Sequence, residues 1–258
     1  MAAKATYVEG KVSVVLAVDS STRGVAVGDT FKEGDHLVTA ADGIVEIELG
    51  TGDIIRLEND TDMTIKSLSR NEKGSTFSIF DLAIGRVKSL VGKLADKDSK
   101  FEYHTKAAIC GVAGTPPWIV TALENATEID LLGKKGGKGA VFTQGFDPKK
   151  TRAIIKPGFR TIIRLGKPPM NPFEIDPARL RMLKGIPFKS LLRGQILMNN
   201  LAWKISIPRV PKGGKSNSLQ ELEKQYNQGS GISGKGRSSS MENNTPVFYR
   251  GKIKVKLN

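Results

Sequence analysis

Apolar and polar residues alternate with a period of two along most of the first 165 residues. Within residues 43–49, Val45, Ile47 and Leu49 fall on one face, and the two glutamates between them fall on the other. One apolar and one polar face are typical of a strand that covers a core on one side. The same pattern predicts strands over residues 11–16, 37–39, 43–49, 53–57, 63–65, 76–82, 85–90, 101–105, 108–112, 118–123, 126–132, 139–143, 153–155 and 159–165.

Turn-forming residues separate these runs. Glycine stands beside aspartate at 28–29, 34–35 and 42–43, where positive φ angles or side-chain caps suit a tight turn. Short strands with frequent turns predict an all-β fold, as a sandwich, a barrel or a solenoid-like stack of mainly antiparallel strands. The prolines at 116–117 are expected to break the ladder because they lack a donor. The Gly- and Lys-rich segment 133–139 is expected to be a hairpin connection.

The pattern changes after residue 165, which divides the chain into a β domain (1–165) and an extension (166–258). Three prolines predict a linker over 166–175. Asp176 followed by Pro177 is a typical helix start, so a short helix is expected over 177–184, ending before Gly185. Residues 211–245 are rich in Gly, Ser and Lys and are expected to be flexible. A terminal strand is expected over 247–257, where lysines alternate with apolar residues.

Charge separates the same two regions. The chain has a net charge of +14, but residues 1–150 hold 19 Lys/Arg and 21 Asp/Glu, whereas residues 151–258 hold 21 and 5. Cations at this density repel one another unless something compensates them, so the extension is expected to meet a partner surface. Its basic residues are interleaved with aromatic ones. The candidate partner-binding residues are Arg179, Arg181, Lys184, Phe188, Lys189, Arg193, Trp203, Lys204, Arg209, Tyr249, Arg250, Lys252 and Lys254.

The residue types that carry catalysis or hold metals are sparse. His36 and His104 have no second ligand at zinc spacing, and Cys110 has apolar neighbours that favour an inert, buried thiol. The aspartates at 60, 62, 96 and 98 lack the spacing of a calcium loop and are expected in turns. The segment 133–139 lacks the order of a phosphate-binding loop. The sequence therefore predicts no catalytic, cofactor or metal site, and a protein that is not an enzyme.

Several partners remain compatible with the basic extension: a protein assembly, an anionic envelope component such as lipid headgroups or acidic polysaccharide, or nucleic acid. Its apolar anchors could also dock it on its own chain. No apolar run reaches the roughly 18 residues of a membrane-spanning helix. No leader peptide is recognisable at the start of this chain, so either a cytoplasmic protein or a mature exported one fits.

Seven segments of the first 165 residues follow one another as in a known family: 8–12, 27–39, 42–49, 52–57, 85–87, 111–115 and 153–158. Through them, residues 7–165 resemble a FecR-type domain. The resemblance implies an all-β, non-enzymatic module that binds proteins or envelope components outside the cytoplasm. In that family the segment that corresponds to residues 111–115 usually has an arginine where this chain has Ala113, and Pro116 and Pro117 are a further departure.

The sequence thus predicts a binding or structural protein of the bacterial envelope, periplasmic or otherwise extracytoplasmic, which joins a homo- or hetero-oligomeric assembly. Its β domain would serve as a scaffold and its cationic extension would engage the partner. The alternative is a nucleic-acid-binding protein that uses the same extension.

Overall fold

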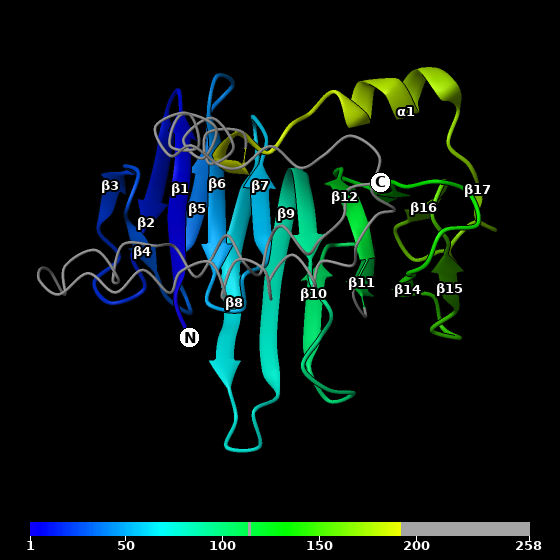
Figure 1. Cartoon of the computed structure of the whole chain (residues 1–258), viewed down its shortest axis with the longest axis horizontal. Coiled ribbons are helices and arrows are strands. Elements are labelled where there is room, and N and C mark those ends of the chain that lie inside the picture. Colours follow the sequence, from blue (N-terminus) through cyan, green and yellow to red (C-terminus); the bar gives the residue numbers. More distant parts are fainter. Residues whose placement is uncertain (113–114, 192–258) are drawn as a thin grey trace, which may run out of the picture.

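The computed structural model describes residues 1–112 and 115–191, which form two β-sheets packed face to face (Figure 1). The predicted all-β fold is confirmed, as a sandwich. Among the described strands, every pairing is antiparallel except that of β9 with β10.

Sheet A contains nine strand segments. In spatial order they are β4 (Thr30–Phe31), β1 (Ala3–Glu9), β6 (Ile44–Leu49), β7 (Ile54–Leu57), the second half of β9 (Thr76–Val91), β12 (Thr115–Ala122), β13 (Ala126–Leu131), β16 (Phe159–Arg164) and β17 (Phe173–Glu174). Sheet B has the same number. In spatial order they are β3 (Thr22–Gly24), β2 (Val12–Val15), β5 (His36–Thr39), β8 (Asp62–Arg70), the first half of β9, β10 (Lys100–His104), β11 (Ala108–Val112), β14 (Val141–Gly145) and β15 (Arg152–Ile155).

Strand β9 belongs to both sheets. The sequence predicted two strands, over 76–82 and 85–90, and the structure joins them into one. The first half pairs with β8 and β10, and the second half pairs with β7 and β12. Gly85 lies where the strand changes sheet and has a φ of 103°, a conformation that glycine adopts without steric strain. Its missing Cβ lets the strand pass close to Thr61.

Side chains from the two inner faces form one hydrophobic core. An aromatic cluster lies near its centre, where Tyr103 contacts Phe80, Phe101 and Trp118 with ring centroids 5.4–5.7 Å apart. The Tyr103 hydroxyl is 2.7 Å from the hydroxyl of Ser89 on β9. The rings therefore fill the space between the sheets, and burial removes the phenol from water.

Pro116 and Pro117 interrupt the ladder as expected, because the pairing of β12 with β9 shifts register between Thr115 and Trp118, although both prolines lie within the bounds of β12.

One expectation about a connection is corrected. The segment 133–139 is no hairpin, because it links β13 in sheet A to β14 in sheet B. Sequence periodicity does not show which sheet a strand joins.

The described part of the extension is ordered against sheet A. Helix α1 (Pro177–Lys184) has the predicted bounds, with the Asp176 side chain accepting a hydrogen bond from the Arg179 amide. Two residues of the expected linker, Phe173 and Glu174, form β17, which pairs with β16 and is the last described strand of sheet A.

Several sequence expectations fall outside the described residues. They are the flexible segment 211–245, the terminal strand 247–257, and candidate residues Arg193, Trp203, Lys204, Arg209, Tyr249, Arg250, Lys252 and Lys254. Within the described ranges, no helix combines the length and apolarity needed to cross a membrane.

The crossing point of β9 gives a stability test. We expect Gly85→Ala to lower the free energy of unfolding by about 3 kcal/mol or more, because the new Cβ would lie 2.4 Å from the Cα of Thr61 at a positive φ. The control is Gly74→Ala, which has a φ of 89° and open space around the new Cβ, and which should lose only about 1 kcal/mol. Urea unfolding measures both, and equal losses would contradict the steric account.

Candidate interaction site: the strap and the cationic end

Residues 175–191, here called the strap, cross the outer face of sheet A. In Figure 1 the strap runs from α1 back towards β6 and β7. Leu183 is fully buried in a cluster with Ile119 and Leu132 of the sheet. Further along, Phe188 is 6% exposed and packs in a cluster with Ile54 and Leu90. The strap therefore buries part of the outer face of sheet A, which would otherwise contact solvent.

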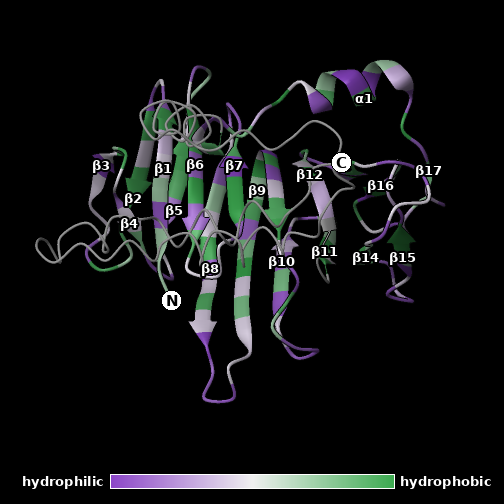
Figure 2. Cartoon of the chain, in the orientation of Figure 1, coloured by the Kyte–Doolittle hydropathy of each residue, from purple (hydrophilic) through white to green (hydrophobic). Residues whose placement is uncertain are grey.

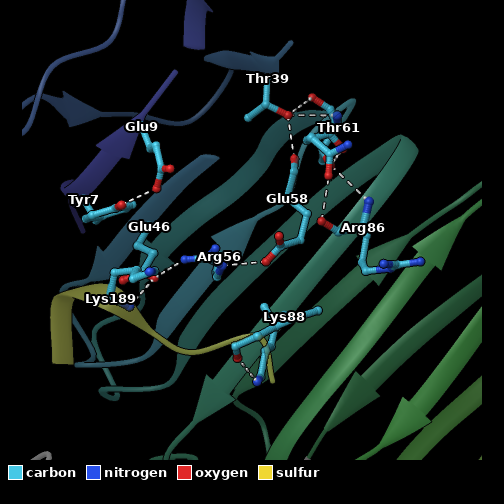
Figure 3. Close-up of polar contacts among 12 residues, drawn as sticks. Tyr7, Glu9, Thr39, Glu46, Arg56, Glu58, Thr61, Arg86, Lys88 and Lys189 are labelled. Atoms are coloured by element: carbon cyan, nitrogen blue, oxygen red, sulfur yellow. Dashed lines mark hydrogen bonds and ion pairs between the residues drawn. The ribbon is translucent and has the colours of Figure 1, made fainter. Parts of the chain in front are cut away.

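That surface carries charged residues. Glu46, Arg56 and Lys88 lie directly opposite one another on β6, β7 and β9, and they are 0%, 3% and 5% exposed. Arg56 donates from Nη1 to Oε1 of Glu46 at 2.7 Å and from Nε to Oε1 of Glu58 at 2.5 Å (Figure 3). Buried charges are strongly destabilising unless they are paired and hydrogen-bonded.

The strap backbone provides the remaining partners. Both oxygens of the Glu46 carboxylate accept hydrogen bonds from strap amides, at 2.6 Å from Lys189 and 2.8 Å from Ser190. These amides begin a helical turn, where unpaired N–H groups attract an anion. At the other end of the row, Nζ of Lys88 donates to two main-chain carbonyl oxygens. One belongs to Leu183, in the last turn of α1, and the other to Ile186, just after the helix. One segment of main chain therefore satisfies an anion with its amides and a cation with its carbonyls.

A second charged cluster anchors the start of α1. Arg179 donates from Nη2 to Glu128 and Asp130 at 2.7 Å each, and from Nε to Asp130 at 2.9 Å. Arg160 of β16 forms ion pairs with the same two carboxylates, at 2.8 and 3.3 Å. Asp130 is fully buried, and its hydrogen bonds raise the pKa of Arg179 above its usual value. Two guanidinium groups and two carboxylates thus hold the helix on the sheet.

The five predicted partner-binding residues that the structure describes divide into two groups. Arg179 and Phe188 are directed into the chain's own sheet, and Lys189 is half-buried with its amide bonded to Glu46. Arg181 and Lys184 are exposed on α1. The self-docking alternative therefore describes the first group. Sequence periodicity does not reveal the carboxylates that bind Arg179 and the Lys189 amide. Glu46 and Glu128 occupy alternating positions that a solvent-facing strand would also show.

Exposed cations gather at the end of the sandwich built from β14 to β17, α1 and their connections. Among described residues, 133–191 expose 11 basic and 2 acidic side chains, whereas 1–132 expose 11 and 9. We call the basic group the cationic end. Its members are Lys134, Lys135, Lys138, Lys149, Lys150, Arg152, Lys156, Arg164, Lys167, Arg181 and Lys184. The two exposed acids are Glu174, which pairs with Lys135, and Asp176, which caps α1.

Large apolar side chains are exposed at the same end. Ile154 on β15 is 64% exposed, and Phe142 on β14 is 39% exposed. Figure 2 shows the hydrophobic colouring of β15 at this side of the molecule. Seven of the twelve exposed large hydrophobic residues fall in this region: Phe142, Phe146, Ile154, Leu165, Met170, Phe173 and Met182. A surface that combines cations with exposed apolar groups is typical of an interaction surface.

The cysteine and the two histidines, the side chains best suited to catalysis or metal binding, have partners within the fold. Cys110 is buried in the core, and burial raises the pKa of its thiol to about 12, so it is not a nucleophile at neutral pH. Nε2 of His36 lies 2.6 Å from Asp62, and Nε2 of His104 lies 3.0 Å from Glu102, each on the outer face of sheet B. Within residues 1–112 and 115–191 no group of three His, Cys, Asp or Glu side chains is arranged to hold a metal ion.

Comparison with known proteins finds similar solved structures but no matching family model or curated protein. Among solved structures, two crystal structures of a candidate anti-sigma factor from Parabacteroides distasonis are similar. They are 15% and 16% identical to this chain, with TM-scores of 0.44 and 0.43, and cover 79% and 78% of it and 95% and 93% of their own chains.

The strap can be tested at its apolar anchor. We expect Phe188→Ala to lower the free energy of unfolding by about 2–4 kcal/mol. It should also speed hydrogen exchange at the Lys189 and Ser190 amides, because the strap loses its hold beside Glu46. The control is Met182→Ala on the same strap, which is 51% exposed and should change stability by less than about 0.5 kcal/mol. Unchanged exchange at both amides in Phe188→Ala would contradict this anchoring role.

Lys88 predicts a pH dependence of stability. Burial lowers its pKa to about 8, with Arg56 adding to this effect and Glu58 and Glu46 opposing it. An unfolded lysine keeps its proton to about pH 10.4. Between these two values the unfolded chain binds more protons, so the free energy of unfolding should rise with pH.

The measurement is urea unfolding of wild type and Lys88→Met from about pH 7 to about pH 10. Wild type should gain stability over the variant, on the order of 1–3 kcal/mol across this window. The comparison cancels the titration of groups that both proteins share. A constant difference, or one that favours the variant as pH rises, would show that Lys88 keeps its proton in the folded state.

Proposed function

We propose that this chain is a non-enzymatic binding protein of the bacterial envelope. Its two-sheet body acts as a scaffold that holds the cationic end against an acidic protein partner or another anionic envelope component. The observation that carries the proposal is the imbalance of exposed charge, 11 basic to 2 acidic side chains over residues 133–191.

The proposal assigns the contact to a surface of the sandwich as well as to the extension. Arg179 and Phe188 are engaged by the chain's own sheet, so they are not free to hold a partner as well. Of the exposed cations, Lys135 pairs with the exposed Glu174 and Arg152 donates to Gln144, but none is buried against the sheet. A cluster with an excess of one sign favours an anionic ligand and speeds its association. The extracytoplasmic setting rests on the resemblance of residues 7–165 to FecR-type domains.

A protein partner is favoured over nucleic acid by the apolar side chains among the cations. Ile154 and Phe142 offer contacts to an apolar side chain, whereas phosphate recognition relies on cations and polar donors. Aromatic residues can also stack on bases, so single-stranded nucleic acid is the alternative that the binding test must separate.

The test uses the full chain and two variants with the same change in net charge. The first reverses four exposed lysines of the cationic end: Lys134, Lys138, Lys149 and Lys150, each to Glu. The second reverses four exposed lysines elsewhere: Lys93, Lys97, Lys100 and Lys106. Binding of poly-L-glutamate, measured by fluorescence anisotropy, should weaken at least about tenfold in the first variant and less than about threefold in the second.

Two results would overturn the proposal. Equal weakening in both variants would mean that only the net charge of the protein matters. Tighter binding of single-stranded DNA than of poly-L-glutamate, with an affinity that falls linearly in log–log form with salt, would assign the surface to nucleic acid instead.

A further inference from the structure

Strand β15 forms an open edge at the cationic end. It pairs with β14 through Val141–Ile155, Phe142–Ile154, Thr143–Ala153 and Gln144–Arg152, and no other described strand pairs with its second side. In the neighbouring sheet A the last described strand at this end is β17, which has two residues and pairs with β16. Figure 1 shows β15 outermost in its sheet.

The hairpin of β14 and β15 shows which main-chain groups of β15 bond to β14 and which face the open edge. The amide of Gly145 donates to the carbonyl oxygen of Thr151 at 3.0 Å, which makes that pair a hydrogen-bonded one. Bonded and non-bonded pairs alternate along an antiparallel ladder. Ala153 and Ile155 therefore bond to β14, and the main-chain groups of Arg152 and Ile154 are directed towards the open edge.

The side chains beside this edge alternate in kind. Arg152, Ile154 and Lys156 are exposed, whereas Ala153 and Ile155 lie further inside. Nε of Arg152 donates to Gln144 at 2.9 Å, which fixes the guanidinium on the outer face of sheet B. Ile154 lies opposite Phe142, whose ring covers Gly111 so closely that a Cβ on that glycine would lie 2.3 Å away. An incoming strand would thus meet a cation, an apolar platform and a second cation in succession.

The charges around β15 indicate which kind of segment can bind at its edge. Lys149 and Lys150 lie in the turn before β15, and Lys156 follows it. The one carboxylate in this turn, Asp147, is 6% exposed and accepts hydrogen bonds from Thr151 and the Lys149 amide. The Lys-bearing segment 247–257 of this chain has the same sign as the edge and is disfavoured there. An acidic segment is complementary to it.

We infer that β15 accepts an extended acidic peptide of a partner protein as an added antiparallel strand. Its main chain would bond to Arg152 and Ile154, with an aliphatic side chain against Ile154 and a carboxylate opposite Arg152 and another opposite Lys156. Strand addition draws its affinity from main-chain hydrogen bonds and its specificity from alternate side chains. This inference rests on the proposed function and adds that the partner binds as an extended strand.

The probe is a fluorescein-labelled peptide with the core Glu-Thr-Val-Thr-Glu, titrated with the full chain in fluorescence anisotropy. The same peptide with both glutamates replaced by lysine should bind at least about tenfold more weakly, because its charges match those of the edge. N-methylation of the central valine removes a donor that faces β15 and should weaken binding by about tenfold. N-methylation of a threonine beside it, whose N–H faces solvent, is the matched control and should have little effect.

Protein variants test the same contact from the other side. Ile154→Pro removes the outward N–H of β15 without removing a bond to β14, and should weaken binding of the acidic peptide by about tenfold. Ile154→Ala keeps the N–H and loses only side-chain contact, so it should weaken binding by about threefold. Circular dichroism and the urea midpoint of Ile154→Pro confirm that the sandwich remains folded. The peptide N-methylation pair needs no protein variant and tests the contact independently.

The outcomes separate this inference from the proposed function. If the acidic peptide binds and the four-lysine reversal of the cationic end weakens it, but Ile154→Pro and valine N-methylation do not, then charge alone holds the peptide and strand addition is wrong. If the peptide binds no better than its lysine counterpart, and the reversal does not affect poly-L-glutamate binding, the proposed function fails as well.

Discussion

The structure depends on the neutralisation of charges that the strap buries on the outer face of sheet A. Glu46 receives two main-chain amides, and Lys88 receives two main-chain carbonyls, from one short stretch of chain. An unpaired buried charge destabilises a protein by several kcal/mol, so a strap without these groups could not lie on this face. These polar contacts add to the apolar clusters around Leu183 and Phe188 in placing the strap.

This constraint divides the basic residues of the chain into two populations. Arg56, Lys88, Arg160 and Arg179 are structural, because each holds a strand or the strap through a buried partner. The exposed lysines and arginines of the cationic end stabilise no such contact, and their mutual repulsion opposes compaction. The net charge of +14 sums both populations, so by itself it does not tell a structural cation from an exposed one. Removing the strap would expose Glu46, Arg56 and Lys88, which it now covers on sheet A.

Much of the sandwich could be predicted from sequence because one-sided strands carry a period-two pattern. The helix at 177–184 was equally readable, since Asp176, Pro177 and Gly185 mark its ends. Strands β3, β4 and β17 were missed, as each has only two or three residues. The N-terminal strand β1 was missed for a different reason: alanines at 3 and 5 fill its inner positions and give a weak apolar signal.

The candidate site was harder to predict because its partners are distant in sequence. Nothing in the pattern around Glu46 distinguishes a glutamate in water from one beneath the strap. The basic residues of the extension are predicted to bind a partner, but Arg179 binds Asp130 of the same chain. The open edge at β15 depends on which strands are neighbours, and periodicity carries no information about that.

The contact between Glu46 and the strap joins residues 143 positions apart. During synthesis β6 and β7 leave the ribosome long before residue 189, so the row of Glu46, Arg56 and Lys88 remains in contact with water while the rest of the sandwich assembles. Loop closure over such a distance is slow, which places docking of the strap late in folding. A nascent chain that stops short of Lys189 would keep hydrated charges where the finished protein has an interior, a difference that a protease could sense.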